Sequence, residues 1–240
     1  MVDPRLVGFF YNPKKGWIDG TTQFVSLLKA YCQPGALVLD LGAGAGRGKP
    51  HFYSLRGKDR LVVGLDVDPE ISENRIVDFK VIGDAYFLPF KECSFDFIYT
   101  DFVLEHVDNP DAFLTEVRRV LRKGGYFTFR TPNLYHYVPS IARIMPNRSK
   151  SLLANFVRNI NTEEKTFPVI YKMNRPGLLR NVLEKKGFAI ERLELIEKEP
   201  SYLVFNTFAF LLGVLYERIV NSAETLKFIR SNILGVFRKI

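Results

Sequence analysis

Val38-Leu-Asp-Leu-Gly-Ala-Gly-Ala-Gly46 is the stretch of this sequence in which an apolar run passes directly into three glycines. Glycine lets the backbone turn tightly and lets a ligand approach without a Cβ in the way, so a strand followed by a binding loop is expected here. The dinucleotide fingerprint is G-x-G-x-x-G, whereas the positions three after Gly44 and Gly46 hold Arg47 and Lys49. The spacing therefore disfavours a nicotinamide oxidoreductase.

Further apolar runs follow this loop at intervals that leave room for helices. Short, nearly continuous apolar strands separated by helical segments indicate a parallel sheet covered on both faces. One such segment, 111–122, has an amphipathic pattern, and Lys123-Gly124-Gly125 is expected to end that helix. The four runs read as strands are 61–66, 79–84, 95–100 and 125–131.

The second half of the chain is less regular. A helix is expected over 176–186, a half-buried strand over 188–197 and a last strand over 233–237. Residues 202–216 contain no charge at all. No repeat or linker interrupts the chain, so we expect one domain over residues 1–240.

Acids and glycines recur at the ends of the expected strands. Val63-Gly-Leu-Asp66 ends the second strand, and Gly83-Asp84-Ala85 closes the third. The segments 88–96, 102–107 and 121–125 complete an ordered set over residues 36–131. In this order and spacing the motifs resemble those of the class I S-adenosylmethionine-dependent methyltransferases, of the type 11 kind.

The resemblance implies an α/β fold, a three-layer Rossmann-like arrangement with helices on both faces of a seven-stranded sheet. That sheet is mostly parallel with one reversed strand, and its seventh strand is expected over 233–237. Two insertions are expected within the single domain. One, over 132–175, lies on the acceptor side, and the other, over 200–231, is apolar and helical.

The resemblance also implies S-adenosylmethionine as the methyl donor. Asp66 accepts hydrogen bonds from both ribose hydroxyls, Val67 lies against the adenine, and Asp84 with the backbone N–H of Ala85 reaches the edge of that ring. Asp66 or Asp84 taken singly would more often be a helix cap than a ligand, and the ordered set carries the interpretation. The implied cofactor-binding set is Asp40, Gly42, Gly44, Gly46, Asp66, Val67, Asp84, Ala85 and Thr100.

Methyl transfer is an in-line displacement at an activated carbon, so the enzyme mainly holds the nucleophile in place. No metal is needed, and none is expected. Where the acceptor is a hydroxyl, a general base helps. The candidates are His106 after the fourth strand, and Tyr135 and His136 after the fifth, with Asn133 beside them. Packing or anchoring of a loop is the structural alternative for each.

The distribution of charge along the sequence indicates the class of acceptor. Lys and Arg balance Asp and Glu over residues 1–131, 17 against 17, whereas residues 132–240 hold 17 against 9. Over 132–175 seven bases face two acids, which favours an anionic acceptor. The fourth strand lacks the Asn/Asp-Pro-Pro-aromatic and Pro-Cys signatures of DNA methyltransferases. A small-molecule, glycan or lipid-linked acceptor, with O-methylation, is therefore favoured over nucleic acid. An RNA methyltransferase and an inactive cofactor-binding scaffold stay open.

Two cysteines without metal spacing and an N-terminus without a signal pattern favour a cytoplasmic protein. Residues 202–216 would span roughly 22 Å as a helix, short of the roughly 30 Å core of a bilayer. That helix is expected to lie at the inner face of the membrane, to pack on its own sheet, or to meet a second subunit in a homodimer.

Overall fold

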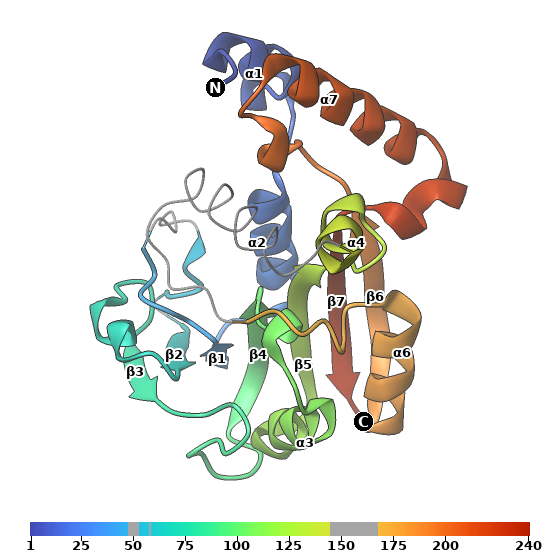
Figure 1. Ribbon diagram of the computed structural model, residues 1–240. Coiled ribbons are helices and arrows are strands. Elements are labelled where there is room, and N and C mark those ends of the chain that lie inside the picture. Colours follow the sequence, from blue (N-terminus) through green and yellow to red (C-terminus); the bar gives the residue numbers. More distant parts are fainter. Residues whose placement is uncertain (48–52, 58, 145–167) are drawn as a thin grey trace. The chain divides into compact units, whose positions relative to one another are not determined.

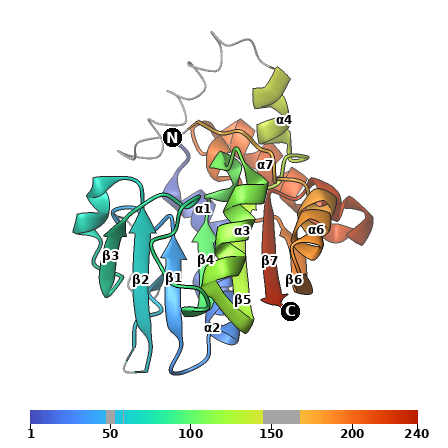
Figure 2. The same cartoon turned by 90° about the horizontal axis from the view of Figure 1, so that it is seen from below.

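The computed structural model describes residues 1–47, 53–57, 59–144 and 168–240. Its seven-stranded sheet has the order β3-β2-β1-β4-β5-β7-β6. The strands are β1 (Leu37–Leu41), β2 (Leu61–Asp66), β3 (Phe79–Ile82), β4 (Phe95–Asp101), β5 (Leu121–Pro132), β6 (Phe188–Ile196) and β7 (Asn232–Lys239). The arrow of β7 runs opposite to those of β1, β2 and β4 (Figure 2). The seven-stranded, mostly parallel α/β fold expected from the sequence is confirmed.

The helices are α1 (Pro4–Phe10), α2 (Gly20–Tyr31), α3 (Pro110–Val120), α4 (Tyr137–Ile144), α6 (Pro176–Lys185) and α7 (Thr207–Ser222). Short 3-10 turns are η1 (Pro13–Lys15), η3 (Pro69–Glu73), η4 (Leu104–His106), η5 (Ser201–Leu203) and η6 (Glu224–Ile229). Figure 1 shows their order along the chain. In Figure 2, α3 covers one face of the sheet and α2 the other.

By its internal contacts the chain divides into two compact units. The sheet unit contains residues 21–132, 169–194 and 233–240. The second unit, called here the helical unit, contains residues 1–20, 133–168 and 195–232. Most of both expected insertions, 132–175 and 200–231, therefore belongs to the helical unit, together with the first twenty residues.

The core of the sheet unit is built from apolar residues of the strands and of the helices that pack on the sheet. Val38 and Leu39 of β1 are fully buried, as are Phe113 and Val117 of α3 and Leu183 of α6. This is the burial expected of parallel strands covered on both faces. The carboxyl ends of β1, β2 and β4 consequently lie at one edge, where α/β sheets bind ligands.

One boundary differs from the sequence prediction. The helix α3 ends at Val120, and β5 begins at once with Leu121, which pairs with Phe95 ahead of a register shift. Gly124 does take a positive φ of 78°. This glycine lies at the irregular start of β5, between the pairing of Leu121 with Phe95 and that of Tyr126 with Phe97. The strand begins at Leu121, which is buried, so the expected helix end at Lys123–Gly125 was wrong.

The helical unit has its own small core. Val2, Tyr11, Phe210 and Val214 are buried together. The helix expected to be apolar on every side, over 202–216, is instead the turn η5 followed by α7, which buries one face only. No helix among the described residues is long and apolar enough to cross a membrane.

Candidate cofactor and active site

The glycine loop begins where β1 ends. Gly42, Gly44 and Gly46 have φ angles of 84°, 55° and 67°, in the left-handed region that side chains with a Cβ disfavour. The backbone N–H groups of Gly42 and Ala43 both donate to the carbonyl of Leu65, at 2.8 and 3.2 Å. The loop is therefore fixed to the neighbouring strand β2.

The three glycines have different surroundings. A Cβ at Gly42 would overlap the side chain of Val103, and one at Gly46 would lie 2.9 Å from the amide of Asn74. A Cβ at Gly44 would meet nothing within 4 Å. Gly42 and Gly46 are thus required by packing. Gly44 lines open space, which is what close approach of a ligand to the backbone requires.

Asp66, the last residue of β2, faces this loop. One carboxylate oxygen accepts the N–H of Gly44 at 2.8 Å, and the other accepts the N–H of Asp68 at 2.9 Å. Two backbone N–H groups hold the carboxylate in a fixed orientation, and each oxygen keeps a further lone pair. A half-buried carboxylate beside an open glycine loop is suited to accept two ribose hydroxyls.

Asn74 holds the loop from behind, a role that sequence reasoning missed. Its amide nitrogen donates to the carbonyls of Ala43 and Gly44, at 3.1 and 2.9 Å, and its oxygen accepts the N–H of Ile76 at 2.9 Å. The side chain is fully buried. The only signal in the sequence is an asparagine shortly after β2, which is too common to interpret alone.

The loops after β2 and β3 carry the expected adenine-binding residues. Val67 is 51% exposed, and Asp84 is also exposed, with one oxygen accepting the N–H of Tyr86 at 2.9 Å. The two loops are joined, since Gly83 donates its N–H to the carbonyl of Asp66 at 2.9 Å. Val67, Asp84 and Ala85 are therefore brought to the same edge as Asp66 by β2 and β3, which pair in parallel.

Two members of the expected set are buried. Asp40 is 1% exposed and hydrogen-bonds to Tyr99, whose pKa burial raises well above its usual value. Thr100 is fully buried on β4. A role for either in ligand contact stays a prediction, and their visible function is to support β1 and β4.

The residue after β4 is backbone-strained. Phe102 has a φ of 57°, which is uncommon for an aromatic residue and often marks a functional site. Its N–H donates to the carbonyl of Arg130 at 3.0 Å, and the Arg130 guanidinium lies 4.6 Å from its ring. Arg130 also forms a buried bidentate pair with Asp101, at 2.6 and 2.7 Å. This ion pair fixes the chain at the carboxyl end of β4.

His106 ends the turn η4 that follows, and its side chain is half-buried in the sheet unit. Its neighbour Glu105 is buried, accepts the hydroxyl of Thr131 at 3.0 Å, and has its pKa raised by burial to about 7. The carbonyl of Glu105 accepts the N–H groups of Ile170 and Tyr171, at 2.7 and 3.0 Å. The acceptor-side segment is thus tied to this turn.

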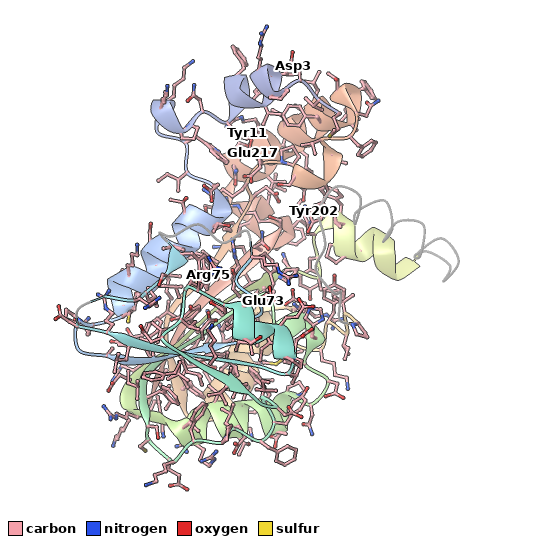
Figure 3. The ribbon with its side chains drawn as sticks, turned by 90° about the vertical axis from the view of Figure 1, so that its left-hand side faces the viewer. Asp3, Tyr11, Glu73, Arg75, Tyr202 and Glu217 are labelled. Carbon is pink, nitrogen blue, oxygen red and sulfur yellow. The ribbon has the colours of Figure 1, made fainter. Side chains whose placement is uncertain are left out.

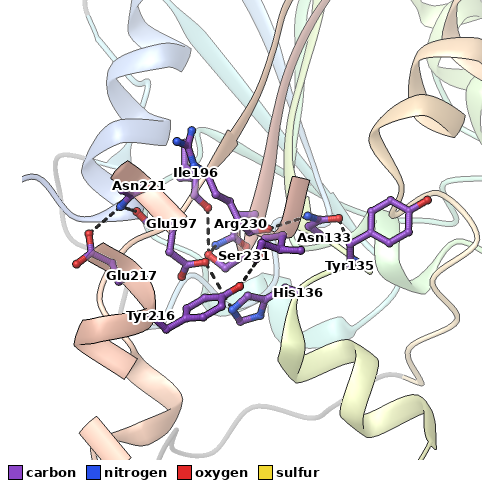
Figure 4. Close-up of polar contacts among 12 residues, drawn as sticks. Asn133, Tyr135, His136, Ile196, Glu197, Tyr216, Glu217, Asn221, Arg230 and Ser231 are labelled. Atoms are coloured by element: carbon purple, nitrogen blue, oxygen red, sulfur yellow. Dashed lines mark hydrogen bonds and ion pairs between the residues drawn. The ribbon is translucent and has the colours of Figure 1, made fainter. Parts of the chain in front are cut away.

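Tyr135 and His136 belong to the helical unit. Tyr135 is 49% exposed, whereas His136 is buried, with its Nε2 atom 3.6 Å from a carboxylate oxygen of Glu197 (Figure 4). Burial lowers the pKa of His136 to about 4 and raises that of Glu197 to about 7. Asn133 anchors the loop by donating to the carbonyls of Phe228 and Arg230, both at 2.7 Å.

Two hollows adjoin the sheet unit. One of about 620 Å³ lies against the glycine loop at Gly46 and Arg47, and includes Glu73 and Arg75. Another of about 590 Å³ contains Lys239, whose ammonium already donates to the carbonyls of Arg118 and Leu121, at 2.7 and 2.6 Å. Among the described residues no group of His, Cys, Asp and Glu could hold a metal.

Known proteins resemble this chain in sequence over the residues that carry these motifs. The family model described as a methyltransferase domain matches residues 39–129. A fatty-acid O-methyltransferase of Mycolicibacterium smegmatis is 28% identical over 71% of this chain and 67% of its own length. A ubiquinone/menaquinone biosynthesis C-methyltransferase of Teredinibacter turnerae is 34% identical over 39% of this chain and 41% of its own.

Solved structures of methyltransferases share the fold. One from Methanosarcina mazei superposes with a TM-score of 0.56 at 20% identity, covering 89% of this chain and 97% of its own. An S-adenosylmethionine-dependent methyltransferase from Mesorhizobium loti gives a TM-score of 0.54 at 20% identity over 89% and 96%. The match spans less than half the length of several curated relatives, among them one from Streptomyces fradiae at 31%.

Proposed function

We propose that this chain, whose residues 39–129 match a methyltransferase domain, is a class I S-adenosylmethionine-dependent methyltransferase that transfers a methyl group to an anionic small-molecule, glycan or lipid-linked acceptor. The observation that carries the proposal is the hydrogen bond from Gly44 to Asp66, which sets a carboxylate beside open backbone.

The described residues fit the methyl donor. Asp66 would hold the ribose, Val67 and the backbone of Ala85 the adenine, with Asp84 accepting from its amino group. Gly44 offers backbone that a side chain would cover. The donor supplies a methyl carbon activated by a positive sulfonium. The chain itself binds, orients and desolvates, and such positioning contributes on the order of 7–11 kcal/mol.

Where the acceptor is a hydroxyl, its proton must leave as the methyl group arrives. His106 is the stronger candidate for the base, because its half-buried side chain belongs to the sheet unit at the carboxyl edge of β4. Tyr135 is exposed and is the second candidate. His136 is enclosed by Glu197, Tyr137 and Tyr216, which favours a positioning role.

The acceptor class rests on charge and on one relative. Residues 132–175 hold seven bases against two acids. Of these seven bases, Lys172 and Arg175 have described side chains, and Lys172 donates to the carbonyl of Asp108 at 2.7 Å. The Mycolicibacterium relative is named for O-methylation of a fatty acid, an anionic and lipidic acceptor. The proposal for this chain is therefore O-methylation of an acceptor with a carboxylate or phosphate.

The proposal is tested by incubating the full chain with a methyl-labelled donor and matched acceptors. Hydroxylated lipids and sugars are compared with and without a phosphate or carboxylate. Label should enter the anionic member of each pair preferentially, and high salt should weaken the preference. Equal labelling of neutral acceptors would contradict the anionic class. Labelling of RNA alone would favour the RNA alternative, and donor binding without transfer to any acceptor would favour the scaffold.

A further inference from the structure

The outer face of α7 is a continuous apolar stripe. Phe208, Leu211, Leu212, Leu215 and Ile219 recur at helical spacing and are 41–71% exposed. The opposite face is buried against the rest of the helical unit. Its residues are Phe210, Gly213, Val214, Glu217 and Val220. The helix is therefore amphipathic, with an apolar side on the surface of the described structure.

The helix α1 extends this apolar surface. It packs beside α7 through Phe10 and Phe210, whose rings are 6.2 Å apart, and Val2 donates its N–H to the carbonyl of Val204 at 2.8 Å. Phe9, on the same helix, is 70% exposed. So many large exposed apolar side chains on one unit indicate a surface with a partner.

Charge is segregated around the stripe. The single acid of residues 201–223, Glu217, points inward, is 5% exposed, and lies opposite Tyr11 (Figure 3). It accepts a hydrogen bond from Asn221 at 2.7 Å. The single base, Arg218, has a side chain that is 55% exposed and forms an ion pair with Glu217 at 3.3 Å. The helix thus exposes its basic side chain, while the acid that pairs with it stays buried.

The rest of the unit has the same bias. Among the described side chains of the unit, the exposed bases are Arg5, Lys14, Lys15, Arg218 and Lys227, and the exposed acids are Asp3 and Glu224. Glu224 forms ion pairs with Lys227 at 3.2 Å and with Arg230 at 3.5 Å, while Glu197 and Glu217 are buried. An isologous dimer would bring this cationic rim against itself. An anionic surface complements it.

We propose that the stripe on α7, with Phe9, docks the protein on an anionic lipid surface. The helix would lie flat in the interface, since the stripe is about 17 Å long at about 1.5 Å per residue, too short to cross the roughly 30 Å hydrocarbon core. Apolar side chains enter the acyl boundary while Arg and Lys meet the headgroups. Docking depends on none of the cofactor residues.

The test is co-sedimentation of the full chain with vesicles, without methyl donor. Vesicles of phosphatidylcholine mixed with phosphatidylglycerol should bind the chain at low salt, and pure phosphatidylcholine should bind it far less. The affinity of the double variant Leu212→Glu/Leu215→Glu for the mixed vesicles should be at least about tenfold lower than that of the wild type. Phe79→Glu, which alters a side chain 56% exposed on β3, should bind like the wild type.

Integrity of the helical unit is followed through its single tryptophan. Trp17 packs on Tyr11 at 5.2 Å, so unchanged emission shows that the double variant keeps this core. Absence of binding to the mixed vesicles at low salt, or equal binding by the double variant, overturns the proposal. So does a lipid-free dimer that the double variant converts to a monomer, because the stripe is then a subunit interface. None of these results bears on methyl transfer, which is assayed separately.

Discussion

The N–H of Gly44 donates to the carboxylate of Asp66 at 2.8 Å, which joins the glycine loop after β1 to the acid that ends β2. Neither residue alone identifies the site. A glycine loop occurs in many nucleotide-binding proteins, and an acid at a strand end often caps a helix. Their hydrogen bond defines a cradle with a fixed acceptor and open backbone.

Asp66→Ala should weaken binding of S-adenosylhomocysteine by roughly 10–100-fold, about 1–3 kcal/mol, because two hydroxyls lose a charged acceptor. Calorimetric titration measures the affinity. Asp111→Asn, at a carboxylate 81% exposed and paired with Lys186 just after α6, is the matched control and should bind normally. Equal affinity of Asp66→Ala and the wild type would remove Asp66 from the site.

The two glycines Gly42 and Gly44 should respond differently to alanine. Gly42→Ala forces a methyl group into Val103 and should cost more stability than the roughly 1–2 kcal/mol of a left-handed alanine, with partial recovery on adding Val103→Ala. Gly44→Ala should lower stability only by the cost of a left-handed alanine. It should nevertheless prevent binding of the cofactor, because its methyl group enters the open space beside the loop. Thermal melts and calorimetry separate the effects. Normal affinity in Gly44→Ala would argue against the cradle.

His106→Gln should lower kcat by about 10²-fold or more with little change in cofactor affinity, if its imidazole takes the acceptor proton. His136→Gln should instead lower the melting temperature more than kcat, since His136 is buried beside Glu197. Steady-state kinetics at several pH values, with melts of both variants, check this contrast. The opposite ranking would assign the base to the helical unit.

The pair formed by His136 and Glu197 predicts a pH dependence of stability. The pKa of Glu197 is raised to about 7, so the folded state favours the protonated acid, and stability is lost as pH rises from about 4.5 through 7. The pKa of His136 is lowered to about 4, so its contribution is lost as pH falls from about 6.5 toward 4. Both directions follow from burial of a charge.

Glu197→Gln should therefore gain about 1–3 kcal/mol relative to the wild type between pH 5 and pH 8, since glutamine cannot ionise. Denaturant unfolding at each pH measures the difference. Glu191→Gln, at a surface carboxylate paired with Arg238, is the control and should follow the wild-type curve. Parallel curves for Glu197→Gln would show that this carboxyl is not titrating in that window.

Arg175→Glu should raise KM for an anionic acceptor by about tenfold and leave the affinity for S-adenosylhomocysteine unchanged, because Arg175 stands in the basic acceptor-side segment and is exposed. Arg192→Glu, on β6, is the control. Arg143→Glu should likewise raise KM for the anionic acceptor. The side chain of Arg143 lies outside the described residues. A lowered cofactor affinity with normal KM would contradict the assignment.

The sheet unit can be predicted from sequence because its signals are local. Each glycine or terminal acid lies within a few residues of the strand that positions it, so the sequence alone identifies Gly44 and Asp66 as candidates. Asn74 and Val103 cannot be identified in this way. They reach the loop only through the fold, and a buried asparagine or valine has no distinguishing pattern in the sequence.

The helical unit is harder to predict for a physical reason. The stretch 202–216 is apolar on nearly every position, so periodicity does not tell its buried face from its exposed one. Phe210 is fully buried while Phe208 is 71% exposed, two positions away. That difference arises from packing against α1, which is distant in sequence, and not from the residues themselves.

The most direct test of the central claim is a calorimetric titration of the full chain with S-adenosylhomocysteine and, in a parallel experiment, with a nicotinamide dinucleotide. We predict binding of S-adenosylhomocysteine with a Kd in the micromolar range, on the order of −8 kcal/mol, and no measurable binding of the nicotinamide nucleotide. Tight binding of the nicotinamide nucleotide, with none of S-adenosylhomocysteine, would contradict the account.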